Sequence, residues 1–212
     1  MQLKDFMEEN FPDTELKPAL FYHWDIGIRF ELGLEWKRGE DYPNNPYVLE
    51  CYEKTIALFE FLHSPIEDIF VVMDINDLDK KKKLKPQLKN LSPYINKTMR
   101  FKLKHQEFPE SLSEESGEET CNINRFILKC KTTDLNYRSL LKAVCNQDLG
   151  LKPSMSHNIY FINIQRKTIF HVYDDRGCDL LAASSDAIKD VYRRYNDWIL
   201  DYDRSKIDRI FE

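Results

Sequence analysis

Three aspartates and one histidine lie close together in the stretch 171–179, and side chains of these types could act in metal-dependent hydrolysis. His171 lies in an apolar run, Asp174 and Asp175 follow it, and Asp179 comes after a short break. Divalent cations bind several hard oxygen ligands that converge within coordination distance. A hydrolase that uses the Asp174, Asp175 and Asp179 carboxylates is therefore one hypothesis for the function.

The same stretch also has a structural interpretation, which we favour. An aspartate at a chain reversal accepts hydrogen bonds from its own backbone, and Arg176 can pair with either neighbouring carboxylate. Gly177 would provide the positive φ that the reversal needs. The sequence contains no second metal-ligand motif, so we expect no bound metal and no other cofactor.

A second group of charges lies on the strand predicted over residues 24–32. Asp25, Arg29 and Glu31 alternate with apolar residues and therefore share one face of that strand. If the face were covered, the three side chains would form a buried charge network and a candidate site. We favour an exposed face, because such regular alternation is typical of a sheet with one side in water.

The middle of the chain is rich in lysine and could contact phosphates. A lysine run starts at Lys80, and further basic residues continue to Lys104, with Phe101 as a ring for base stacking. This region supports nucleic-acid binding as a further alternative. We do not expect a nucleic-acid partner, because the formal net charge is -5 and lysine runs are usually solvated.

The other reactive side chains form no recognisable site in the sequence. The five cysteines are far apart and include no Cys-x-x-Cys pair, so we interpret them as reduced thiols with packing roles. The five histidines have no spacing suited to a metal. The six glycines form no phosphate-binding loop, which argues against the familiar nucleotide-dependent enzymes.

Alternating and helical patterns predict the elements that position these residues. In the first half we expect a strand over 24–32, a helix over 48–62, a buried strand over 69–73, an amphipathic strand over 98–107 and an acidic loop over 109–121. In the second half we expect a strand over 124–130, a helix capped by Asp134, strands over 158–164, 168–173 and 179–183, and a helix over 184–200.

These elements predict an α+β fold. The expected architecture is a mainly antiparallel sheet with helices packed on one face, and a C-terminal β-meander followed by a long helix. We expect a single domain over residues 1–212. A subdivision into 1–75 and 96–212, around the lysine-rich connecting segment 76–95, is the alternative.

Composition indicates a folded chain without a membrane span. Apolar residues make up 42% and aromatic residues 13%, so disorder is not expected. No apolar run approaches the roughly 18 residues that a spanning helix needs, and the first residues are amphipathic rather than typical of a signal peptide. We therefore expect a soluble, cytoplasmic protein that does not bind membranes.

Three stretches together resemble a known bacterial family. They are the residues 21–33 (Phe-Tyr-His-Trp-Asp-Ile-Gly-Ile-Arg-Phe-Glu-Leu-Gly), 172–179 (Val-Tyr-Asp-Asp-Arg-Gly-Cys-Asp) and 198–204 (Trp-Ile-Leu-Asp-Tyr-Asp-Arg). This set is similar to the domain of unknown function number 3885, which is frequent in bacilli. The resemblance implies one intact unit and carries no activity that can be transferred.

Taken together, the sequence favours a non-enzymatic interaction protein of the immunity or antitoxin kind. The chain has an acidic balance, many tyrosines and tryptophans for contacts, and no catalytic or cofactor motif. An acidic face would neutralise a basic protein partner such as a nuclease toxin. The metal-dependent hydrolase and the nucleic-acid-binding protein remain the alternatives, and the sequence does not predict an oligomeric state.

Overall fold

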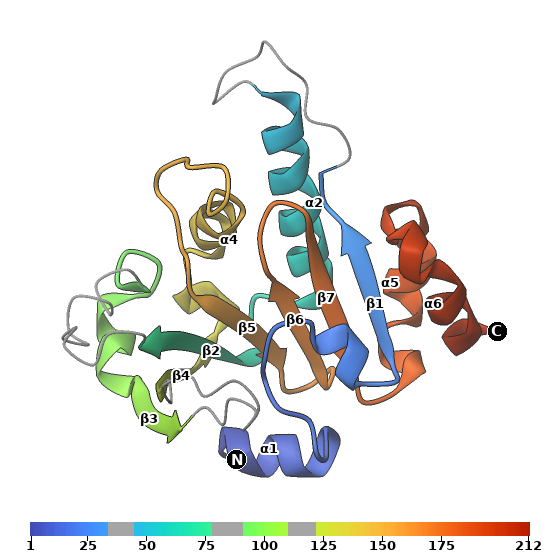
Figure 1. Cartoon of the computed structure of the whole chain (residues 1–212). Helices are drawn as coiled ribbons and strands as arrows, with labels where there is room; N and C mark the ends of the chain where they lie inside the picture. Colours follow the sequence, from blue (N-terminus) through green and yellow to red (C-terminus); the bar gives the residue numbers. More distant parts are fainter. Residues whose placement is uncertain (34–44, 78–90, 110–121) are drawn as a thin grey trace, which may run out of the picture.

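A seven-stranded antiparallel sheet runs through the described part of the chain (Figure 1). The structure, a computed structural model, describes residues 1–33, 45–77, 91–109 and 122–212. The strands are β1 (Gly27–Glu31), β2 (Asp68–Asp77), β3 (Lys104–Pro109), β4 (Asn122–Lys131), β5 (Asn158–Asn163), β6 (Thr168–Val172) and β7 (Gly177–Ala182). The predicted α+β class with a mainly antiparallel sheet is confirmed.

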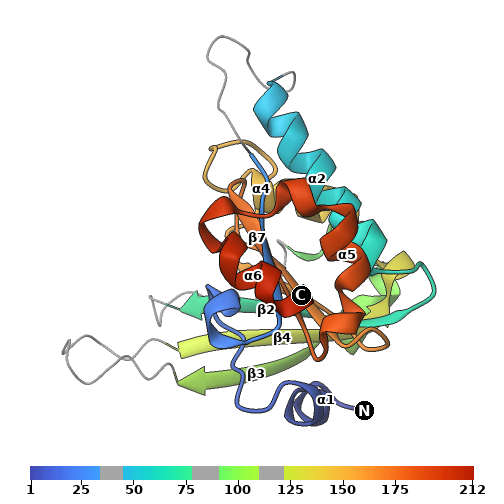
Figure 2. The same ribbon diagram turned by 90° about the vertical axis from the view of Figure 1, so that its right-hand side faces the viewer.

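The strand order explains how distant parts of the sequence meet. It is β1-β7-β6-β5-β2-β4-β3, and every neighbouring pair is antiparallel. The predicted C-terminal meander is β5-β6-β7. Because β2 lies between β5 and β4, strands from both sides of the segment 76–95 share one sheet. The sheet twists strongly, so that β3 and β4 cross the direction of β1 in Figure 2.

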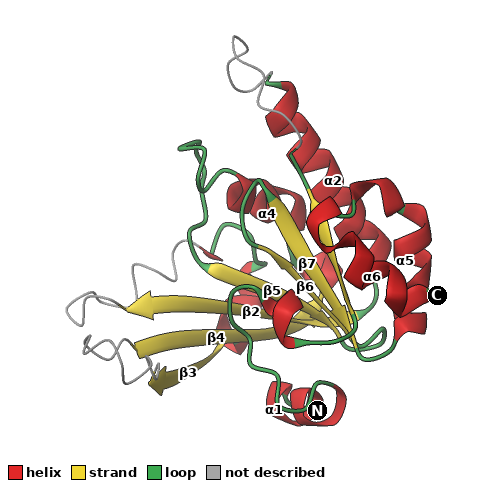
Figure 3. Cartoon of the chain, turned by 45° about the vertical axis from the view of Figure 1, so that its right-hand side comes forward, coloured by secondary structure: helices red, strands yellow, loops and turns green. Residues whose placement is uncertain are grey.

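Helices cover both faces of the sheet (Figure 3). On one face lie α2 (Pro46–Leu62), α4 (Tyr137–Cys145), α5 (Lys189–Arg194) and α6 (Arg204–Phe211), and on the other lies α1 (Leu3–Asn10). The start of α2 follows from its sequence, since Pro46 occupies the first turn and the Asn45 side chain accepts a hydrogen bond from the Tyr47 N–H at 3.0 Å. Helix α1 adds a cover that the expected one-sided arrangement did not include.

Two apolar cores result, one on each face. Successive side chains of a strand point to opposite faces, so a buried strand supplies both cores. In β2, Ile69 and Val71 pack in the larger core under α2 and α4, while Phe70 and Val72 pack in the smaller core with α1. The run 69–73 is therefore apolar on both sides because β2 lies inside the sheet.

Several predicted elements differ from the structure. The strand expected over 98–107 begins only at Lys104, because Asn96 caps a 3-10 helix over Lys97–Lys102 that leaves Phe101 94% exposed. Helix α4 is capped by Asn136, and Asp134 instead accepts a hydrogen bond from the Lys131 N–H at 2.9 Å.

The helical segment 184–200 is observed in pieces around α5. It consists of a 3-10 turn Ser185–Ala187, α5, and a second 3-10 turn Asn196–Trp198. The chain leaves the helical conformation at Ile199, because Ile199 pairs with Phe30 in a β-bridge and the Leu200 N–H donates to the Arg29 carbonyl at 2.9 Å. A further 3-10 turn, Asp201–Asp203, leads into α6.

Candidate functional site

Arg29 lies where the three stretches 21–33, 172–179 and 198–204 meet. Its Nε donates to Asp179 Oδ1 at 3.0 Å, and its Nη1 donates to the Tyr22 hydroxyl at 2.7 Å. The same Nη1 lies 3.5 Å from Asp203 Oδ2. One guanidinium thus connects the N-terminal part of the chain, the strand β7 and the C-terminal segment. We call these four residues the Arg29 cluster.

The charged side chains of the Arg29 cluster are largely buried, which corrects the prediction of an exposed face at Arg29, whereas Tyr22 is exposed. The side chains of Arg29, Asp179 and Asp203 are only 13%, 0% and 6% exposed. Residues 20–23 form a 3-10 turn that folds back over the strand, and the Phe21 N–H donates to Asp179 Oδ2 at 3.2 Å. Sequence alternation did not reveal this cover, because the covering residues belong to neighbouring turns rather than to the strand itself.

Electrostatics and ring contacts hold the guanidinium in its charged form. Burial lowers the pKa of Arg29, but the Asp179 carboxylate together with the Tyr173 and Tyr22 hydroxyl groups outweighs this effect, so the pKa lies above its ordinary value. Burial raises the pKa of Asp179, and Arg29 offsets part of that rise. The rings of Tyr22 and Tyr173 flank the guanidinium with centroids at 4.7 and 5.6 Å. Such a fully engaged charge network is suited to holding segments together.

Asp25 and Glu31, the other two charged residues predicted on this face, are not part of the Arg29 cluster. Asp25 is exposed, and Glu31 is half-buried at the end of β1. The Glu31 carbonyl accepts a hydrogen bond from Lys54 Nζ at 3.5 Å. Within the described ranges, Arg29 is therefore the one member of this predicted group that enters a charge network.

The aspartates of the stretch 171–179 have separate partners. Asp174 accepts hydrogen bonds from the Arg176 N–H at 2.7 Å and from Arg176 Nε at 2.9 Å, which is the pairing that the turn interpretation predicts. Asp175 accepts one from the Tyr47 hydroxyl at 2.6 Å. Asp179 belongs to the Arg29 cluster. Over the described ranges the structure shows no group of three His, Cys, Asp or Glu side chains that could hold a metal ion.

Gly177 is required for a different reason from the one that the sequence suggested. The glycine with a positive φ in the described residues is Gly150, not Gly177. A Cβ at position 177 would lie 2.7 Å from the Phe30 carbonyl oxygen and would overlap the Tyr173 hydroxyl. The glycine therefore permits close approach between β7, β1 and the Tyr173 ring.

His171 extends the row of side chains that begins with Arg29 and Asp179. Register partners place Arg29 opposite Asp179, Asp179 opposite His171 and His171 opposite Tyr160, so the four lie on one face of the sheet. The His171 ring stacks on Tyr160 with centroids 4.4 Å apart, and neither ring nitrogen has a hydrogen-bond partner among the described residues. Burial lowers the pKa of His171 to about 3, so the imidazole is neutral and packs as a ring.

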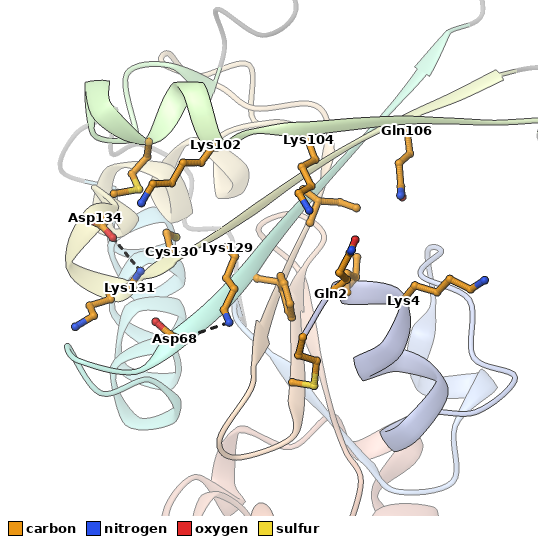
Figure 4. A pocket seen from close by; sticks show the side chains of 15 residues that line it. Gln2, Lys4, Asp68, Lys102, Lys104, Gln106, Lys129, Cys130, Lys131 and Asp134 are labelled. Carbon is orange, nitrogen blue, oxygen red and sulfur yellow. Dashed lines mark hydrogen bonds and ion pairs between the residues drawn. The ribbon is translucent and has the colours of Figure 1, made fainter.

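A groove lined by lysines lies on the same face, at the other end of the sheet (Figure 4). Its volume is about 600 Å³. The floor is apolar and includes Leu3, Phe70 and Ile127, all buried. Lysines from α1, β4 and the region around β3 surround this floor, together with two aspartates: Lys4, Lys102, Lys104, Lys129, Lys131, Asp68 and Asp134. We call this surface the lysine groove.

Among the described residues, two of the five lysines of the groove, Lys4 and Lys129, pair with a carboxylate. Lys129 Nζ lies 4.0 Å from Asp68, and the exposed Lys4 pairs with Glu8 at 3.6 Å. For Lys102 and Lys104, by contrast, the described part of the chain provides no carboxylate within ion-pairing distance. Figure 4 shows Lys104 directed from β3 towards β4, whereas Lys102 extends away from α1, towards the end of the groove where Asp134 and Lys131 lie.

Sequence reasoning found only part of the lysine groove. Lys102 and Lys104 belong to the predicted basic region, whereas Lys4, Lys129 and Lys131 come from distant segments. Arg100 is turned to the Ser92 carbonyl, to which its Nη2 donates at 2.7 Å, and the lysine run 80–83 lies outside the described residues. The pairs Lys102/Lys104 and Lys129/Lys131 have the spacing of one strand face, but only the pairing of β3 with β4 could have joined them.

Comparison with other proteins identifies the family and one relative. The structure also bears on membrane insertion: none of the helices in the described ranges is long and apolar enough to cross a membrane.

The relative is a bacterial protein. The chain is 31% identical over 214 residues to the "Uncharacterized protein YnaE" of Bacillus subtilis (strain 168), and the match covers 95% of this chain and 99% of that protein. No solved structure matches significantly. The model of the "Domain of unknown function (DUF3885)" matches residues 3–203. The chain therefore belongs to the DUF3885 family of bacterial proteins.

Proposed function

We propose that this protein acts without catalysis, by binding another protein, and that the lysine groove is the binding surface. The observation that carries this proposal is the groove itself, in which an apolar floor is surrounded by charged side chains. Protein interfaces commonly combine an apolar centre with a polar rim. An immunity-like or antitoxin-like protein, the class that the sequence suggested, would act by such binding.

The contacts of the predicted catalytic residues support binding over catalysis. Arg29 donates a hydrogen bond to Asp179, Arg176 donates one to Asp174, and the Tyr47 hydroxyl donates one to Asp175. A side chain that acts as acid, base or metal ligand must lie within reach of a bound substrate. These three internal contacts instead give each of the charged side chains a structural role.

A reducing compartment is supported by the thiols. The four cysteines in the described residues are all buried and free: Cys51, Cys130, Cys145 and Cys178. Burial raises the pKa of the Cys130 and Cys145 thiols to about 12, so the reactive thiolate form is disfavoured. We propose the cytoplasm as the place where the protein meets its partner.

Site-specific crosslinking in the native bacterial host tests this function. We would incorporate the photo-crosslinking residue p-benzoylphenylalanine at Gln106, an exposed position of the groove, and at the exposed Lys152 as a control. We expect a discrete adduct with one protein at position 106, absent at position 152 and lost in Lys102→Glu/Lys104→Glu. Equal adducts at both positions, or none at 106, would show that the groove is not a protein-binding surface.

A further inference from the structure

We infer that the lysine groove binds an acidic segment of the partner chain that carries an apolar anchor side chain. This inference rests on the proposed function and specifies the chemistry of the partner. It differs from the sequence-based expectation, in which an acidic face of this protein would meet a basic partner. The charge of the groove, its apolar floor and the positions of its lysines support this inference.

The groove reverses the sign of the protein's overall charge. The whole chain has a formal net charge of -5, whereas five lysines and two aspartates line the groove. Lys102 and Lys104 are exposed, and among the described residues no carboxylate pairs with either. A positive patch on a protein surface attracts anionic partners.

The apolar floor distinguishes a protein segment from a purely ionic ligand. Leu3, Phe70 and Ile127 form the floor, and the volume of about 600 Å³ is large enough for several side chains. Lysine stems add apolar surface along the rim while their ammonium groups stay in water. An aliphatic or aromatic side chain that enters this space would be buried, with its acidic neighbours beside the lysines.

The aromatic rings of the region are poorly placed for nucleic acid. Single-stranded nucleic acid binds by stacking bases on open ring faces. Phe70 is only 2% exposed, and Lys129 Nζ lies 5.9 Å from its ring centroid. Phe101 is exposed but does not line the groove. Because the Phe70 ring is buried and cannot stack on a base, and lysine ammonium groups pair with carboxylates, the groove favours an acidic peptide over nucleic acid.

The positions of the charges predict the orientation of the segment. Lys104 and Gln106 follow the β3 side of the groove, while Lys102 extends towards the end that holds Asp134 and Lys131 (Figure 4). The acidic residues of the partner should therefore lie along Lys102 and Lys104. The apolar anchor should lie over Ile127, and the end near Asp68 should carry no negative charge.

Direct binding of synthetic peptides tests this chemistry. The probes are a fluorescein-labelled peptide of Glu-Asp-Phe-Glu repeats, about twelve residues long, and matched peptides with Gly in place of Phe or with Lys in place of the acids. A single-stranded oligonucleotide and vesicles containing phosphatidylserine represent the other anionic classes. Binding is followed by fluorescence anisotropy or co-sedimentation with the full-length protein.

We expect the acidic, Phe-containing peptide to bind best. Lys102→Glu/Lys104→Glu should weaken its binding by about tenfold or more and reduce the salt dependence. The matched control Lys17→Glu/Lys152→Glu changes the net charge equally at exposed positions outside the groove and should change binding by less than about twofold. Circular dichroism and thermal unfolding of each variant check the fold.

Three results would overturn the inference. They are equal binding of the acidic and basic peptides, equal effects of the two double variants, and tighter binding of the oligonucleotide or the vesicles than of the peptide. The crosslinking experiment separates this failure from failure of the proposed function. A Gln106-specific protein adduct whose crosslinked segment is not acidic would overturn only the partner chemistry, whereas the absence of any adduct would overturn both.

Discussion

Replacing Arg29 by methionine removes the charge at the centre of the Arg29 cluster while retaining most of the side-chain volume. Asp179, whose side chain is 0% exposed, then loses its ion pair and retains the hydrogen bond from the Phe21 N–H. Breaking a buried pair in this way costs about 3–5 kcal/mol of unfolding free energy. For a domain that is stable by about 5–15 kcal/mol, this is a large loss.

The pH dependence gives this prediction a specific signature. In the variant, the buried Asp179 can take up a proton instead of remaining charged. From an ordinary pKa of about 3.9, protonation costs about 4 kcal/mol at pH 7 and about 1.5 kcal/mol at pH 5. The folded variant binds a proton that the unfolded chain does not, so the difference from the wild type should shrink by about 2–3 kcal/mol as the pH falls from 7 to 5.

Urea unfolding at both pH values measures these free energies. Arg138→Met is the matched control, because the Arg138 side chain is 60% exposed and pairs with Glu60 at the surface. Such a pair contributes about 1 kcal/mol or less. If Arg29→Met costs no more than Arg138→Met, or if its cost is the same at pH 5 and pH 7, the Arg29 cluster does not stabilise the fold through a buried charge.

Three further predictions concern packing, protonation and thiol chemistry. Gly177→Val should lower the unfolding free energy by about 1–3 kcal/mol because a side chain there overlaps the Phe30 carbonyl, and an unchanged melting temperature would contradict this. Burial lowers the pKa of His63 to about 4 and of His171 to about 3, so the unfolded chain binds more protons below about pH 6.5. Stability should therefore fall by about 3 kcal/mol per histidine between pH 6.5 and 4, and His171→Phe should flatten this decline in a pH series of unfolding curves. The four buried thiols in the described part of the chain are those of Cys51, Cys130, Cys145 and Cys178. They should be alkylated only on unfolding, as followed by mass spectrometry of labelled peptides, and rapid labelling of the native protein would contradict their burial.

Strong local patterns were sufficient to predict most of the sheet. The apolar run 69–73 and the hairpin-like stretches 158–164, 168–173 and 179–183 correspond to β2, β5, β6 and β7. Where one residue redirects the chain, pattern alone failed. Asn96 caps a 3-10 helix inside the alternating segment 98–107, and the β-bridge of Ile199 interrupts the helical stripe 184–200. A tertiary contact overrides periodicity in the second case.

The candidate site was harder to predict because its residues depend on pairing between strands. Arg29 and Asp179 were both identified as candidate residues, but their ion pair follows only from the register of β1 with β7. Likewise, the lysine groove requires β3 to lie beside β4 and α1 to cover the same face. A sequence pattern predicts which side of a strand is polar, whereas burial of that side is decided by segments far away in the chain.

The two edges of the sheet suggest why the recognisable stretches and the lysine groove lie at opposite ends. At the β1 edge, the bridge between Phe30 and Ile199 and the Arg29 cluster attach the C-terminal segment and close the sheet. All three stretches that resemble the family, 21–33, 172–179 and 198–204, contribute to this closure. At the β3 edge, by contrast, the residues 104–108 are exposed beside the lysine groove. Among the described residues no strand pairs with the outer side of β3, and charged side chains on such an edge resist unspecific strand pairing. The stretches by which the sequence resembles the family therefore lie at the β1 edge, whereas the lysine groove that we propose as a binding surface lies at the β3 edge.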